Sequence, residues 1–485
     1  MDIRLLAKMG LSRAGCLEHN HIDLSTLQMN SLQKINRLDL LAGTALIVLT
    51  IFTLGLIVYI NWLGISVNLQ TTNPRDQISP HEVLTLTFSL PMKPSAVENA
   101  LRLQPNISGR LEWEDERTVH FIPTQPYLGN LVVSLTRGQL GMTGEWLRHD
   151  TSWDLTVRQP QIVYINHAEP KSELMTTTVT GETSHQLTFT NGKVFDFSVS
   201  PSGDTIAYIL VNDQRGFDLW LINRNGENPR RLIDSGRGHC LSPVWSPDGT
   251  SIAYSRQTAG LQPTDPLGAP RLWVINVQSG ENHAVFSDSQ IIGYGALWSP
   301  DGNWLSTFDG IADQMHFIHL KSGQQVSIPS SLGSLGSWSP DSRFLIYPDQ
   351  TLGVNNVLKT YLYQADFQTG ETSIFLGKGS DTTDYFYGNP AWSPDGKNIV
   401  FSLRINPGKA DGQLWLMNVE SLGGPTIAQG DGFSYSSYSW DPWGIGVVMQ
   451  QINLKKSYTP EMAIWYPSQG LQILPMNGIF PHWLP

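Results

Sequence analysis

A five-residue phrase, Trp-Ser-Pro-Asp-Gly, recurs along the chain and constrains the fold more than any other feature. Ser, Pro, Asp and Gly in this order are the preferences of a type I turn, so each copy is predicted to close a hairpin. A repeat of 40 to 54 residues with strand-like content is typical of propeller blades. Four near-full copies and three weaker ones lie at Ser200, Ser246, Ser299, Ser339, Ser393, Asp441 and Leu484.

The segments that follow each phrase have the pattern of further strands. After Gly249, Ser251 to Tyr254 alternate in character, and Leu272 to Ile275 read as a third strand. A glycine turn at Gly280 and a short fourth segment complete the unit. Four antiparallel strands make one propeller blade.

The two ends of the repeat region complement each other. Residues 161–188 read as a blade that lacks its first strand, and Phe480 to Trp483 read as a first strand that lacks its blade. Pairing them would close a ring and leave no free strand edge. The sequence therefore predicts a β-propeller over residues 161–485 with seven blades, or with six if one weak copy is not a blade.

The phrase and the strands behind it resemble the propeller repeats of TolB and of prolyl oligopeptidase-type peptidases. The resemblance covers residues 161–485 and implies a propeller fold. Resemblance to TolB implies protein partners. The peptidases carry in addition a hydrolase domain with a G-x-S-x-G nucleophile turn, and this sequence contains no such motif.

An apolar segment precedes the predicted β domains. Leu40 to Ile60 contain no charged residue and are long enough to span a hydrocarbon layer of about 30 Å as a helix. We therefore predict a transmembrane helix over residues 40–62. Lys34 and Arg37 on its N-terminal side favour a cytoplasmic segment at residues 1–39 and put the remaining domains outside the cytoplasm. A cleaved signal peptide is the alternative.

Residues 68–158 lack the repeat and have several short strand-like runs, such as Val83 to Phe88 and Leu131 to Leu135. These runs with turn residues between them predict a β-sandwich. The run from Phe88 to Met92 resembles bacterial Ig-like domains of envelope and surface proteins. TolB itself carries a mixed α/β domain before its propeller, so the resemblance does not extend to this segment. The fold class is thus all-β behind one N-terminal helix.

Composition and motifs restrict the function. The net charge of −11 and the lack of a basic patch exclude nucleic acid as a partner. The sequence has no H-E-x-x-H, C-x-x-C, phosphate-loop or EF-hand pattern, so we predict no cofactor, no metal and no catalytic residue.

The predicted binding site lies on one propeller face. Loops between strands two and three, and between consecutive blades, emerge on the same face. They are long and dissimilar, which favours binding there; the longest are residues 257–270, 349–358, 406–412 and 451–460. Two neighbouring blade junctions on this face are aromatic and acidic, which is typical of an interface. Packing between blades is the other interpretation. The candidate partner-binding residues are Asp381, Asp384, Tyr385, Phe386, Tyr387, Asp431, Phe433, Tyr435 and Tyr438.

These features together predict a single-pass protein of the bacterial cell membrane that acts as a non-catalytic binding or scaffold protein. Its partner would be an envelope protein or peptide. The alternative is a propeller enzyme that acts on an envelope glycan or peptide at the tunnel mouth. A sensor that signals through the helix to residues 1–39 is a third option.

Overall fold

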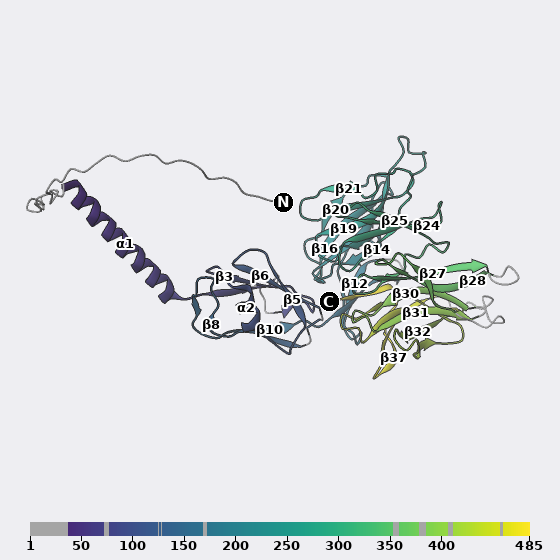
Figure 1. Cartoon of the computed structure of the whole chain (residues 1–485). Coiled ribbons are helices and arrows are strands. Elements are labelled where there is room, and N and C mark those ends of the chain that lie inside the picture. Colours follow the sequence, from purple (N-terminus) through teal and green to yellow (C-terminus); the bar gives the residue numbers. More distant parts are fainter. Residues whose placement is uncertain are drawn as a thin grey trace, which may run out of the picture. The chain divides into compact units, whose positions relative to one another are not determined.

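The computed structural model consists of one long helix followed by β-sheet domains (Figure 1). It describes residues 37–71, 77–124, 126, 127, 129–167, 172–352, 358–377, 385–405, 411–455 and 459–485. Residues 1–64 and 65–485 form two separate compact units. Two helices are present in the described residues, α1 (Arg37–Leu63) and the short α2 (Pro94–Ala100).

Helix α1 contains the apolar run that the sequence analysis singled out. Its described side chains, at residues 40–55, are all exposed to solvent. A search of the described residues by helix length and hydropathy finds no helix that would cross a membrane.

Residues 65–157 form a two-sheet β-sandwich. One sheet has the strand order β1-β3-β6-β5 and the other β2-β10-β7-β4. β10 pairs with β7 in antiparallel and with β2 in parallel orientation. The strands are β1 (Val67–Gln70), β2 (Gln77–Ile78), β3 (Leu84–Phe88), β4 (Leu101–Gln104), β5 (Gly109–Trp113), β6 (Thr118–Pro123), β7 (Asn130–Leu135) and β10 (Thr151–Val157), beside the small pair β8 (Gly138–Gln139) and β9 (Trp146–Leu147).

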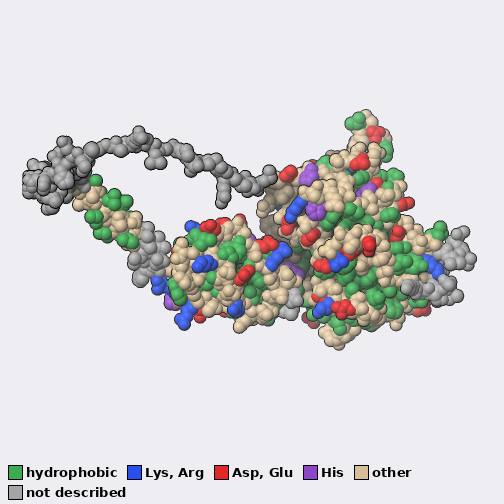
Figure 2. All heavy atoms as spheres, viewed as in Figure 1, with side chains coloured by type: hydrophobic (Ala, Val, Ile, Leu, Met, Phe, Trp, Pro, Cys, Tyr) green, Lys and Arg blue, Asp and Glu red, His purple; other side chains and the backbone are tan. Residues whose placement is uncertain are grey.

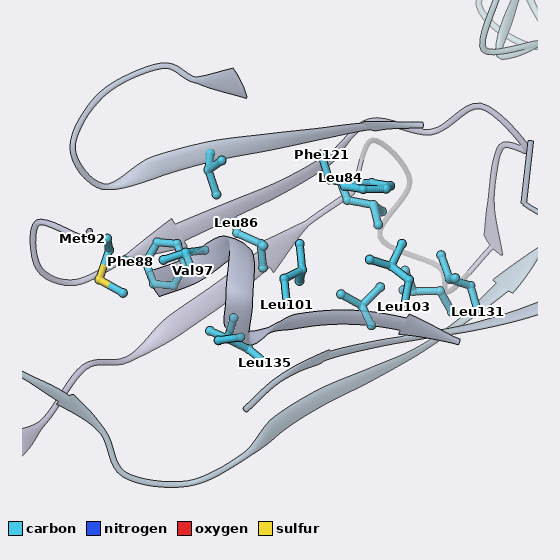
Figure 3. Packing of buried hydrophobic residues seen from close by; sticks show 14 of the residues in the cluster. Leu84, Leu86, Phe88, Met92, Val97, Leu101, Leu103, Phe121, Leu131 and Leu135 are labelled. Carbon is cyan, nitrogen blue, oxygen red and sulfur yellow. The ribbon is translucent and has the colours of Figure 1, made fainter. Parts of the chain in front are cut away.

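The core of the sandwich follows from strand alternation. Along β3, Leu84, Leu86 and Phe88 are buried while the two threonines between them are partly exposed. Figure 3 shows these side chains pointing between the sheets toward Leu101 and Leu131 of the opposite sheet. Residues 65–157 thus have two sheets around one core, as a β-sandwich requires, and the assignment as Ig-like remains a prediction.

The rest of the chain forms a propeller-like array of four-stranded antiparallel meanders. Five of them are separate sheets, and β14 to β21 form one eight-stranded sheet in which a single parallel bridge between Phe217 and His239 joins two meanders. The strands are β11 (Gln161–Asn166), β12 (Leu174–Thr177), β13 (Ser184–Gln186), β14 (Val194–Val199), β15 (Thr205–Val211), β16 (Phe217–Asn223), β17 (Arg230–Ile233), β18 (His239–Trp245), β19 (Ser251–Gln257), β20 (Arg271–Asn276), β21 (Asn282–Ala284), β22 (Tyr294–Trp298), β23 (Trp304–Asp309), β24 (Gln314–His319), β25 (Gln325–Pro329), β26 (Ser337–Trp338), β27 (Phe344–Leu352), β28 (Leu358–Asp366), β29 (Thr372–Leu376), β30 (Tyr385–Trp392), β31 (Asn398–Ile405), β32 (Gln413–Asn418), β33 (Thr426–Gln429), β34 (Phe433–Trp440), β35 (Val447–Asn453), β36 (Pro460–Tyr466), β37 (Gly470–Ile473) and β38 (Gly478–Leu484).

The ends of this array pair as the sequence predicted. Strand β38 is antiparallel to β11, with Trp483 opposite Ile162 and Leu484 opposite Gln161. A buried cluster that contains Ile162, Val448 and Trp483 packs the sheet of β38 and β11–β13 against the β34–β37 meander. The last strand of the array is thus built into its first sheet.

The repeated phrase forms a self-contained hydrogen-bond network. In the copy at Ser246, Gly249 N–H donates to Ser246 O (2.9 Å), which closes the predicted turn. Ser246 Oγ donates to Asp248 Oδ1 (2.5 Å) and accepts from Ser251 N–H (3.0 Å). The same serine-to-aspartate bond recurs at Ser299, Ser339 and Ser393. The aspartates therefore hold the hairpins and are not free for chemistry.

The tryptophan of the phrase joins neighbouring meanders. We call the first strand of each meander its inner strand. Trp245 Nε1 donates to Ser198 O (3.2 Å) of the preceding inner strand, and Trp298 Nε1 donates to Val244 O (3.3 Å) in the same way. Equivalent bonds run from Trp440 to Ala391 and from Trp483 to Ser439. Trp338 and Trp392 lack a partner for this N–H among the described residues. The indole N–H groups thus tie successive inner strands together around most of the array.

The weaker copies of the phrase contact the segment that precedes the propeller. Arg158, between the sandwich and β11, donates to Ser202 O, Asp204 Oδ1 and Pro485 O. Trp443 Nε1 donates to Tyr127 O of the sandwich (3.0 Å). In these copies the turns therefore contact other parts of the chain.

One predicted loop is in fact an extension of two strands. Residues 349–358 were expected to be a long loop, but Asp349 pairs with Tyr361 and Leu352 with Leu358. β27 and β28 are therefore a long hairpin, in which residues 353–357 lie outside the described part of the chain. The β-branched Thr351 inside this segment favours strand over loop, and the predicted strand that begins at Tyr361 extends back to Leu358.

Candidate partner-binding face

The propeller presents two different faces. Hairpins of the repeated phrase, together with the turns between third and fourth strands, lie on one face. Connections between second and third strands, and from each meander to the next, lie on the other, which we call the loop face. Because the Ser-Asp networks satisfy the polar groups of the hairpins, chemical variety is concentrated on the loop face.

Buried carboxylates hold connections of the loop face in place by accepting hydrogen bonds. Asp309 accepts from the N–H groups of Ile311 (2.9 Å), Ala312 (3.0 Å) and Ile292 (3.0 Å). Burial opposes ionisation of Asp309, but these hydrogen bonds outweigh it and lower its pKa. Asp218 accepts from Ser235 N–H and Oγ in the same manner. A buried carboxylate that accepts several backbone donors fixes a loop in one conformation.

The connections of the loop face carry apolar side chains that are exposed to solvent. Phe189, Leu261 and Ile311 are 80%, 95% and 82% exposed. Leu261 lies in a connection whose carbonyls at Gly260 and Gln262 accept from Arg237 (2.7 Å each). Further exposed apolar residues of the loop face are Tyr294, Leu332, Leu352 and Leu358, whereas the turns of the opposite face present Leu320, Leu422 and Ile445. Figure 2 shows charged side chains scattered over the visible surface between apolar and uncharged polar atoms.

The first predicted aromatic group lies on β30. Tyr385, Phe386 and Tyr387 are partly buried, and Tyr387 packs against Phe401 with ring centroids 5.9 Å apart. Tyr385 and Tyr387 contact the buried cluster between β27–β29 and β31–β32. Asp381 and Asp384 lie outside the described residues.

The second predicted group lies at β34 and is more deeply packed. Tyr435 is buried, and burial raises its pKa. Tyr438 Oη accepts from Ser402 N–H (3.0 Å) and donates to the carbonyl of Asn389, so that it joins β34 to the preceding meander. Phe433 packs against the same core, and Asp431 forms an exposed ion pair with Lys455. Tyr435 is thus buried and Tyr438 is partly buried, and the contacts of both are those of the packing interpretation, while a role of this group in binding stays a prediction.

Sequence reasoning missed the residues that shape the loop face. Asp218 interrupts an otherwise apolar strand between Phe217 and Leu219, and a lone acid in such a run is a usable signal. A second usable signal in the sequence is a proline two residues before the tryptophan of the phrase, such as Pro243. It follows Ser242, whose positive φ of 49° marks a bulge in the inner strand.

The described residues offer weak support for catalysis. Ser327 Oγ lies 2.9 Å from His316 Nδ1, but His316 Nε2 is 3.8 Å from Asp309 Oδ2, which is too long for a hydrogen bond. Burial raises the pKa of Asp196 on inner strand β14 to about 6, against hydrogen bonds from backbone N–H groups. A search of the described residues finds no group of His, Cys, Asp and Glu that could hold a metal.

Comparison with known families identifies the propeller. Residues 153–370 match the family model described as TolB beta propeller domain. Over these residues the chain is similar to the TolB propeller, in agreement with the resemblance carried by the repeated phrase.

Two curated relatives share part of the chain. It is 25% identical over 223 residues to the uncharacterized peptidase YuxL of Bacillus subtilis, which covers 44% of this chain and 30% of that protein. It is also 25% identical over 145 residues to the uncharacterized protein YidR of Escherichia coli, covering 27% and 31%. The chain thus spans about a third of the length of these relatives.

Solved structures give a similar picture. TolB from Acinetobacter baumannii is 16% identical and aligns with a TM-score of 0.40 over 78% of this chain and 82% of its own. The propeller domain of the Trilobed protease from Pyrococcus furiosus is 11% identical, with a TM-score of 0.45 over 72% and 93%. At these values the likeness carries no argument for function.

Proposed function

We propose that this protein is a non-catalytic binding or scaffold protein of the bacterial cell envelope that engages a protein or peptide through the loop face. One observation carries the proposal: exposed apolar side chains collect on the loop face, on connections that buried acids and Arg237 hold in place. Exposed apolar groups on a soluble surface favour contact with a partner. Connections that are already ordered reduce the entropy lost on binding.

A paired substitution tests the use of this face. Leu261→Ser with Ile311→Ser removes two fully exposed apolar groups without touching the core. We expect cross-linked partners captured by the wild-type protein from envelope preparations to be lost with this variant and kept with the control Ile445→Ser on the opposite face. Identical capture by all three proteins, with unchanged thermal melting, would contradict the proposal.

We further propose that α1 anchors the protein in the cell membrane, with residues 1–39 in the cytoplasm. The proposal is supported by the uncharged run from Leu40 to Ile60 and by the exposure of every described side chain of that helix. Leu49→Arg with Phe52→Arg should shift the protein from the carbonate-resistant membrane fraction to the soluble one, since each charge is costly in the hydrocarbon layer. The opposite result, unchanged membrane retention, would exclude α1 as the anchor.

The proposal includes the number of propeller blades and the type of the β-sandwich. We propose a closed ring of seven blades, supported by the pairing of β38 with β11 and by the four-stranded meanders on each side of the bridge at Phe217. We propose the sandwich as an Ig-like spacer between α1 and the ring.

An enzyme acting on a glycan or peptide is the alternative. One relative bears the name of a peptidase, and the contact between Ser327 and His316 is the feature that favours it. A fluorophosphonate probe tests this alternative. Labelling of Ser327 that is lost in Ser327→Ala and in His316→Ala would favour the enzyme over the non-catalytic binding protein.

A further inference from the structure

A pocket lies where the first sheet meets β14–β17, and its lining runs from the connection 187–193 on the loop face to Gly226 and Pro229 in the β16–β17 turn of the opposite face. Its volume is about 520 Å³. The connection 187–193 forms its rim, and its wall is apolar, formed by Leu187, Tyr208, Leu210, Trp220, Ile222 and Pro229. Pockets that bind small groups combine an apolar wall of this kind with a few polar groups.

The rim of the pocket is rigid. Buried Glu173 accepts from Thr190 N–H (2.7 Å), Thr188 Oγ (2.7 Å) and Gly192 N–H (3.1 Å). These bonds fix the connection on both sides of Phe189, whose ring is 80% exposed. An aromatic ring held in solvent beside a pocket loses little freedom when a partner covers it.

Most polar groups around the pocket are bonded to one another. Lys193 Nζ pairs with Asp213 (2.8 Å), and Asn212 Nδ2 donates to Asp218 Oδ1 (2.9 Å) and Gly236 O (2.7 Å). Among the described residues, the contact of Asp218 Oδ2 is a long one of 3.5 Å with Arg231. Asp218 Oδ2 is thus an acceptor with remaining capacity at the polar end.

Trp220 supplies a donor without a partner. Its Nε1 is buried and has no hydrogen-bond partner among the described residues. The tryptophan at the same place in β32, Trp415, donates instead to Gln413 (2.8 Å). An unpaired buried donor is unfavourable, so its presence in the wall of a pocket calls for an external acceptor.

We propose that this pocket is the anchor site for an apolar residue of a partner peptide, an inference that rests on the proposed function and locates it. The apolar side chain fills the pocket under Phe189. One peptide group lies at the polar end, where its carbonyl accepts from Trp220 Nε1 after a small turn of the indole ring and an N–H donates to Asp218 Oδ2. A saccharide ring carries hydroxyl groups around its rim, and the apolar wall would leave them unpaired.

The test uses three small probes with the full chain and ligand-observed NMR. N-acetyl-phenylalanine amide carries an apolar side chain and peptide groups, N-acetyl-glycine amide carries the peptide groups alone, and methyl glucoside represents a saccharide. We expect saturable binding of the first probe with a Kd on the order of 1 mM, the affinity typical of a ligand of this size. The glycine and glucoside probes should not bind.

Matched variants locate the binding. Trp220→Phe keeps the ring but removes the donor, and Phe189→Ala removes an exposed ring, so each should weaken binding of the phenylalanine probe about fivefold or more. Trp273→Phe, the equivalent position in β20, and Leu422→Ala, exposed on the opposite face, should leave it unchanged. Because Phe189 is exposed, loss of folding would not explain its effect.

Three results would overturn the proposal: no saturable binding of the phenylalanine probe, binding by Phe189→Ala and Trp220→Phe that equals binding by the wild-type protein, or preference for methyl glucoside. These outcomes are separable from the loop-face test. If Leu261→Ser with Ile311→Ser abolishes partner capture while Phe189→Ala retains it, the loop face binds a partner but this pocket is not its anchor.

Discussion

Single polar side chains decide how well each hairpin of the repeat is held. Ser393 is fully buried, donates to Asp395 (2.6 Å) and accepts from Asn398 N–H (2.9 Å). Ser393→Ala leaves both partners without this hydroxyl and should lower the free energy of unfolding by about 1–3 kcal/mol. The denaturation midpoint in urea measures the loss. Ser287→Ala, at an exposed position, is the control, and equal midpoints for the two variants would count against the network.

The carboxyl group of Asp196 makes stability depend on pH. Burial raises its pKa to about 6 from the ordinary value of 3.8, so the folded state binds its proton more tightly than the unfolded state does. Its contribution is therefore complete below the unfolded pKa and is lost as pH rises through about 6. Asp196→Asn should stabilise the protein at neutral pH by about 1–2 kcal/mol and flatten this dependence. Denaturation midpoints on both sides of pH 6 check it. A parallel pH dependence in wild type and variant would show that another group is responsible.

At the scale of the element, the indole bonds between inner strands are unequal. Trp245 Nε1 donates to Ser198 O, whereas Trp338 Nε1 has no partner among the described residues. Both side chains are buried, so substitution to Phe removes similar buried apolar area and the difference reports the hydrogen bond. Trp245→Phe should destabilise by about 1 kcal/mol more than Trp338→Phe. Thermal melting of the two variants side by side makes the comparison, and a larger loss at Trp338 would contradict it.

At the scale of the whole molecule, Arg158 links the entry of the propeller to its last strand. Its buried guanidinium contacts Asp204, Ser202 O and Pro485 O, while Arg224 also donates to Pro485 O (2.6 Å). Arg158→Gln removes a buried charge whose partner Asp204 is 35% exposed, and should cost about 2–3 kcal/mol through the lost charged hydrogen bonds.

The effect of Arg158→Gln should concentrate at the closure. Amide hydrogen exchange in β38 and β11 should accelerate more than in β23 and β24, since closure depends on the pairing of the first two. Lys321→Gln, an exposed cation, serves as the control. Uniform exchange rates across the strands would show that Arg158 does not secure the ring.

The sequence by itself determined the β architecture, because it rests on local chemistry. Turn preferences from Ser246 to Gly249, alternation along Leu84 to Phe88, and a first strand at Phe480 to Trp483 each specify a hairpin, a strand or a pairing without knowledge of distant residues. The recurrence of the phrase at each hairpin also predicted a structural role for its aspartates, and each of them accepts a hydrogen bond from the serine of its own turn.

Only the tertiary structure decided which side chains remain available. Tyr435 and Phe189 are both aromatic residues of blade connections or their flanking strands, yet one is buried and the other is exposed. The difference comes from residues distant in the sequence: neighbouring strands enclose Tyr435, while Glu173 holds the connection that carries Phe189. Exposure depends on how the meanders pack against each other, and no local pattern encodes that.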